Sequence, residues 1–291
     1  MALRPRALPK LRDQTARYVT DPHAPIRSNT SPAVHPGLDA LSRHLPAAEM
    51  YWVASDMAAL AMSAGTQLAA ARWATADRPA PCGLMVWDGG IGNLDMQGFS
   101  LPVEACAWGP AEGGCLVWVF MSRARLIEEM RSQNSPYELQ ADQMPPLVPM
   151  YGWTLPIDEP LSMADLPEEA PEPVFAALAA AWLLMQQPQL IDRTREHADT
   201  ATRRAYGRQQ LADPEITVVD LRRQYVPDTA DPDEDGPGRR YRHRWVVSGH
   251  WRDQPYGPDR SLRRQTWIPA HVKGPKGAPM LATERVNVWR R

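Results

Sequence analysis

The residues best suited to chemistry lie near the C-terminus, between Tyr241 and Arg252. In this stretch the odd positions are mainly aromatic. The even positions hold most of the cations and are Arg242, Arg244, Val246, Ser248, His250 and Arg252. In a β-strand, a period of two sends these sets to opposite faces. Guanidinium groups bind phosphate and carboxylate oxygens through paired N–H donors. The pattern therefore predicts a cationic binding face, or else a half-buried strand whose outer face is solvated.

Three cations downstream extend this candidate binding set: Arg263, Arg264 and Lys273. Charge also divides along the chain, with a net −9 over residues 1–200 and +7 over residues 201–291. A basic C-terminal part favours nucleic acid as the partner. An acidic protein surface would satisfy the same arginines, and so would the acidic part of this chain.

His250 is the candidate for catalysis, because it lies beside Arg252 on the predicted cationic face. A neutral histidine near cations could act as a general base in metal-free RNA cleavage. A second histidine, His243, falls on the opposite face by parity, so both cannot serve one site without a bulge. We therefore expect His250 to be a structural residue and the protein to act by binding.

No sequence motif indicates a metal or a cofactor. The chain has no C-x-x-C or H-E-x-x-H pattern, and its glycine-rich stretch at 89–92 lacks the Lys-Ser/Thr of a P-loop. The cysteine count is odd, which argues against a disulfide framework and favours buried thiols in the cytoplasm. No apolar run approaches the ~20 residues of a membrane span, so no membrane partner is expected.

The elements that position these residues indicate an α+β protein with an antiparallel N-terminal sheet. Residues 1–36 are rich in proline and arginine without apolar periodicity, which predicts an extended basic arm. Residues 37–133 then form an N-terminal domain. Its expected elements are helices at 38–44, 55–74 and 123–133, and strands at 83–87, 103–108 and 115–121.

The second half of the chain reads as linker, helix and sheet. Residues 134–172 have the proline and acid content of a linker. Residues 173–210 hold two linking helices, at 173–187 and at 194–208. The helix at 173–187 is apolar all round, so we expect it to be buried. Residues 215–291 form an antiparallel β module with a mobile acidic loop at 227–238. Its strands are expected at 216–223, 241–252, 265–273 and 285–290.

The C-terminal part also resembles a group of actinobacterial, phage and plasmid proteins. The resemblance covers about the last 120 residues. It rests on Trp182–Gln187, Val219–Arg223, Gly249–Arg252, Gln254, Tyr256-Gly257, Arg263-Arg264, Trp267–Pro269 and Lys273–Pro275. It implies an accessory role on a mobile element and carries no activity with it.

Together these patterns predict a non-enzymatic binding or regulatory protein of a phage or mobile element, with nucleic acid as the partner. A protein-interaction module, such as a toxin neutraliser or an assembly subunit, is the first alternative. A metal-free ribonuclease-like enzyme is the second.

Overall fold

The computed structural model describes residues 3–68, 73–96, 99–132, 143–156, 159–222 and 245–273. The chain forms two compact units, Met1–Arg223 and Gln224–Arg291. The predicted loop at 227–238 and the predicted strand at 285–290 lie outside the described residues.

The first unit is built on a seven-stranded sheet of order β7-β6-β5-β2-β1-β9-β8. β1 runs parallel to both of its neighbours, β2 and β9, and all other neighbours in the sheet are antiparallel. These strands are β1 (Glu49–Val53), β2 (Gly83–Trp87), β5 (Ala105–Ala111), β6 (Gly114–Ser122), β7 (Leu147–Leu155), β8 (Ile191–His197) and β9 (Glu215–Leu221). A separate hairpin pairs β3 (Asn93–Met96) with β4 (Phe99–Pro102).

The α+β class is confirmed, but the sheet is mixed and not antiparallel as predicted. The difference arises from β1, for which no strand is predicted, and from β9, which is predicted as a strand of the C-terminal module. β1 is a short, almost wholly buried run, and such runs show no period of two. The strands predicted at 103–108 and 115–121 are present as β5 and β6, which form a hairpin with its turn at Glu112-Gly113.

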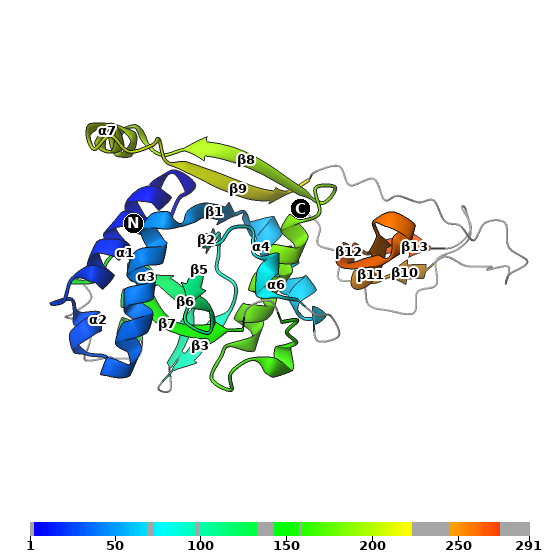
Figure 1. The fold of residues 1–291 in the computed structure, drawn as a ribbon, viewed down its shortest axis with the longest axis horizontal. Helices are drawn as coiled ribbons and strands as arrows, with labels where there is room; N and C mark the ends of the chain where they lie inside the picture. The colour runs from blue at the N-terminus through cyan, green and yellow to red at the C-terminus, as the bar shows by residue number, and fades with distance from the viewer. Residues whose placement is uncertain are drawn as a thin grey trace, which may run out of the picture. The chain divides into compact units, whose positions relative to one another are not determined.

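Helices cover both faces of this sheet (Figure 1). On one face α1 (Leu8–Thr20) and α3 (His35–Ala47) pack over a cluster that includes Trp52 and Trp118. On the other, α4 (Ser55–Gly65) packs against α6 (Glu172–Met185). The remaining helical segments are η1 (Pro5–Ala7), α2 (Pro25–Ser28), η2 (Pro32–Val34), η4 (Thr75–Asp77), α5 (Arg123–Ser132), η6 (Met163–Asp165) and α7 (Thr200–Arg208).

The predicted extended arm is instead largely helical. α1 buries Leu8, Leu11, Thr15 and Val19, which follow each other at three- and four-residue steps. Thr15 obscures this stripe in the sequence, but its hydroxyl donates a hydrogen bond to the carbonyl of Leu147 at 2.8 Å. A threonine so satisfied can lie in a core.

The apolar helix α6 is buried as predicted, but it belongs to the first unit and does not link domains. Every residue from Val174 to Met185 is buried. The Trp182 ring meets the Trp108 ring edge to face, with centroids 5.2 Å apart, and meets Trp73 at 6.2 Å. Such pairs stabilise beyond the area they bury.

Two further segments differ from the sequence-based expectation. The predicted linker at 134–172 contains β7, an edge strand whose Pro149 lies at a register shift opposite β6, where a missing N–H is tolerated. The predicted helix at 194–208 is divided into β8 and α7. The division falls at Asp199, whose side chain caps α7 by accepting from the N–H of Thr202.

The described part of the second unit, residues 245–273, holds two small antiparallel strand pairs. β10 (Trp245–Val247) pairs with β13 (His271–Lys273), and β11 (His250–Tyr256) pairs with β12 (Leu262–Ile268). A short helical turn, η7 (Pro258–Arg260), lies in the β11–β12 connection. The predicted strand at 241–252 therefore does not run through, because residues 248 and 249 separate β10 from β11.

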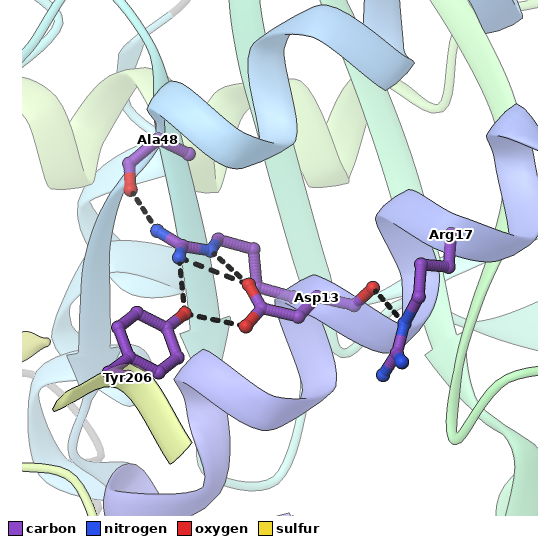
Figure 2. A network of polar contacts seen from close by, with 5 residues as sticks. Asp13, Arg17, Ala48 and Tyr206 are labelled. Atoms are coloured by element: carbon purple, nitrogen blue, oxygen red, sulfur yellow. Dashed lines mark hydrogen bonds and ion pairs between the residues drawn. The ribbon is translucent and has the colours of Figure 1, made fainter. Parts of the chain in front are cut away.

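A polar network fastens α1 to α7 (Figure 2). The Tyr206 hydroxyl donates to Asp13 Oδ2 at 2.6 Å and accepts from Arg12 Nη2 at 2.7 Å. Arg12 also donates to the carbonyl of Ala48 and to Asp13 Oδ1. Burial and the bond to Asp13 raise the pKa of Tyr206 to about 12, so its hydroxyl stays protonated and keeps donating.

Gly65 tests the packing of α4 on α6, and Gly207 in α7 is the control. A Cβ at Gly65 would lie 2.9 Å from the backbone carbon of Ala176, whereas a Cβ at Gly207 in α7 would meet nothing within 4 Å. We expect Gly65→Ala to lower the free energy of unfolding by about 1–3 kcal/mol through overpacking. Gly207→Ala should be neutral or stabilise by up to about 1 kcal/mol. Urea unfolding measures both, and equal losses would contradict the packing argument.

Tyr206→Phe tests the network. The change removes both hydrogen bonds of the hydroxyl and leaves the Asp13 carboxylate with one donor fewer, which should cost about 1–3 kcal/mol of unfolding free energy. Arg17→Ala is the control, since this exposed side chain donates to the backbone carbonyl of Asp13. It should change stability by less than about 0.5 kcal/mol. A Phe variant as stable as the wild type would show that the network contributes nothing.

Candidate partner-binding surface

The β11–β12 hairpin sorts its side chains into two faces. Directly opposed residues share a face of an antiparallel pair, and the register runs from His250 opposite Ile268 to Tyr256 opposite Leu262. One face, called here the arginine–tyrosine face, therefore holds His250, Arg252, Gln254, Tyr256, Leu262, Arg264, Thr266 and Ile268.

The far end of this face is exposed and amphipathic. Tyr256 and Leu262 are 41% and 49% exposed, unusual values for large apolar side chains in this molecule. The Arg264 guanidinium carbon lies 5.4 Å from the centroid of the Tyr256 ring, in cation–π contact. Tyrosine and arginine are the residue types that dominate protein–protein hot spots. Arg252 adds a further exposed cation on the same face.

The opposite face carries the small core of the hairpin. Trp251 and Trp267 pack edge to face with centroids 5.3 Å apart, and Trp267 is only 4% exposed. A Cβ at Gly249 would lie 2.6 Å from Trp267 Cζ2, so the backbone approaches the ring too closely for any other residue. Trp267 is thus a core residue and not a platform for stacking bases.

The structure brings together only part of the predicted cationic set. His250 and Arg252 share a face as predicted, and Arg264 joins them across the hairpin. Arg263 lies on the opposite face, where its Nη1 donates to the carbonyls of Arg260 and Leu262. Lys273 belongs to the other strand pair, with β10. Arg242 and Arg244 lie outside the described residues.

The local geometry of His250 fits a structural role. Its Nδ1 lies 3.0 Å from the carbonyl oxygen of Ser248, two residues earlier, at the break between β10 and β11. His271 makes the same contact with the carbonyl of Pro269. Each ring therefore satisfies a nearby main-chain carbonyl. The catalytic use of His250 stays a hypothesis, and neither of these main-chain contacts supports it.

Two thiols of the first unit, those of Cys106 and Cys115, are unsuited to nucleophilic chemistry. Cys106 and Cys115 are buried, and burial raises the pKa of Cys115 to about 11 and that of Cys106 further. Both therefore remain protonated near neutral pH. Within the described ranges no group of histidine, cysteine and carboxylate side chains could hold a metal ion.

Sequence reasoning missed Tyr256 and Leu262. Their pairing depends on the turn at 257–261, where Gly257, Asp259 and Arg260 all adopt positive φ. The Gly-Pro-Asp run is a recognisable turn signal. However, positive φ at Asp259 and Arg260 is rare for residues with a Cβ, and the resulting register cannot be read from the sequence.

Among the described segments, no helix is both long and apolar enough to cross a membrane. No curated protein matches the chain. Residues 132–272, a little less than half of the chain, match the model of the AcrVA2-like family, described as an anti-CRISPR type V subtype A2 family. This agrees with the mobile-element setting expected from the sequence, although the resemblance drawn there did not include CRISPR inhibition. The matched range contains both β8 and the whole β11–β12 hairpin, so the arginine–tyrosine face lies within the part of the chain that is similar to anti-CRISPR proteins.

Proposed function

We propose that this protein inhibits a type V CRISPR system by binding one of its Cas proteins. The similarity of residues 132–272 to the AcrVA2-like family carries the proposal. It replaces the leading expectation from the sequence, a nucleic-acid partner, with the alternative of a protein-interaction module.

The arginine–tyrosine face supports a protein partner. Its exposed end combines an aromatic ring, an aliphatic side chain and guanidinium groups, a composition enriched in protein interfaces. Among the described residues, this face holds two arginines, Arg252 and Arg264, beside His250. Two arginines are few for a surface that must neutralise many phosphates. Arginine paired with carboxylates of the Cas protein would fix the register of the contact.

Under this proposal, binding to the Cas protein is sufficient for inhibition. An inhibitor that occupies a surface of its target needs affinity and no chemical step. The buried, protonated thiols of Cys106 and Cys115 and the main-chain contacts of His250 and His271 are consistent with that mode of action.

The direct test uses the full-length protein and a type V CRISPR system directed against a plasmid. Expression of the protein should restore transformation by the targeted plasmid, and the purified protein should bind a purified Cas protein of that system. Exchanging both arginines, Arg252→Glu with Arg264→Glu, should weaken this binding by about 10- to 100-fold, as expected for hot-spot residues.

Arg263→Glu is the matched control, because Arg263 precedes Arg264 in β12 and is also exposed but lies on the opposite face. It should bind nearly as the wild type does. Binding to DNA or RNA with a steep salt dependence, and to no Cas protein, would overturn the proposal in favour of nucleic acid. Equal losses in the double variant and in the control would remove the arginine–tyrosine face from the interface.

A further inference from the structure

The sheet of the first unit ends at β8, which has β9 on one side and no other strand among the described residues (Figure 1). Six of its seven residues, Asp192–His197, are not buried, and five of these six are exposed. β8 is thus an edge strand whose second side is available for pairing.

Hydrogen bonds at both ends of β8 fix which backbone groups point outward. The Arg222 N–H donates to the carbonyl of Leu190, and the Ala198 N–H donates to that of Pro214. In an antiparallel ladder the bonded residues alternate, so the even residues 192, 194 and 196 face β9. The N–H and C=O groups of Arg193, Arg195 and His197 therefore point away from the sheet.

Asp199, the next odd-numbered residue after His197, shows how an outward-pointing N–H is used where another segment lies beside it. Asp199 continues the series beyond the strand, and its N–H donates to the carbonyl of Arg6 at 3.2 Å. The segment around η1 thus occupies the edge where β8 ends. No corresponding acceptor lies beside Arg193 or Arg195 in the described segments.

The side chains of β8 add a charge pattern to this edge. The odd positions Arg193, Arg195 and His197 share one face, and the even positions Asp192 and Glu196 share the other. Arg195 pairs with Glu215, and Glu196 pairs with Arg6, but Arg195 keeps 78% of its side chain exposed. Exposed pairs of this kind contribute little and can be exchanged.

This pattern opposes antiparallel pairing of β8 with a second copy of itself. Outward-pointing groups of two such strands can pair only odd residue with odd and even with even. In each such register that pairs at least five residues of each strand, Arg193 or Arg195 lies opposite an arginine, and each carboxylate lies opposite a carboxylate or Thr194. Opposed like charges destabilise a sheet. The same constraint favours a foreign strand with the reverse charges.

We propose that β8 is a docking edge for an extended segment of a partner protein that alternates acidic and basic residues. The segment would add a strand antiparallel to β8, with main-chain bonds to Arg193 and Arg195. Its acidic side chains would face Arg193, Arg195 and His197, and its basic side chains would face Asp192 and Glu196. This surface is separate from the arginine–tyrosine face and does not depend on the partner being a Cas protein.

The test titrates the full-length, isotope-labelled protein with a synthetic peptide. In this peptide glutamate and lysine alternate at successive positions, and β-branched residues flank the charged run at both ends. The peptide should slow amide hydrogen exchange at Arg193 and Arg195. It should leave Thr194 and Glu196 unchanged, because their amides are already bonded to β9. A peptide of the same composition with its glutamates and lysines in separate blocks is the control and should protect neither.

Two variants separate main-chain pairing from charge attraction. Arg195→Pro removes an outward N–H that β9 does not use, and it should abolish the protection at Arg193. Arg195→Gln removes the charge but keeps the N–H, and should retain the protection more weakly. Intact protection of Thr194 and Glu196 in both variants shows that β8 is still folded. Protection of even instead of odd amides, equal effects of the two peptides, or no effect of either on the wild type would overturn the proposal.

Discussion

The burial of α6 is the constraint on which the first unit depends. Beyond Pro173 this helix has no charged residue, and all of its remaining circumference is buried. Such a helix is stable only between apolar layers. β6, whose nine residues are all buried, lies within the sheet that supplies one layer, and α4 supplies another. The glycine at the end of α4 permits the close approach, because its missing Cβ leaves room for the α6 backbone.

The family match cuts across this architecture. Residues 132–272 provide β7 at one end of the sheet, β8 and β9 at the other, α6 on one face and the described strands of the second unit. The strands between them, β1, β2, β5 and β6, come from residues 49–122. The matched segment therefore needs the preceding part of the chain to complete its core. Its two proposed contact surfaces, by contrast, lie on elements it contains entirely.

The sequence predicts elements whose pattern is local and fails where a residue's role depends on distant partners. The helix at α6 and the β5–β6 hairpin are evident from composition and glycine placement. β8 is not, because a run as polar as Asp192–His197 has no apolar alternation, and its strand character comes from pairing with β9. The arginine–tyrosine face was half predicted. Parity places His250 with Arg252, but Arg264 and Tyr256 join them only through a register set by the turn at 257–261.

The position of β9 has a consequence for how the chain is made. Tyr51 of β1 pairs with Thr217 of β9, so a central strand of the sheet pairs with a strand that is synthesised much later. Contacts between such distant residues slow folding, because a long loop must close before the pairing stabilises anything. Until residue 221 has left the ribosome, one side of β1 carries unpaired main-chain groups beside the apolar Trp52. A nascent chain in this state presents a second, transient edge in the middle of its future sheet, and translation that ends early would leave a product prone to aggregation.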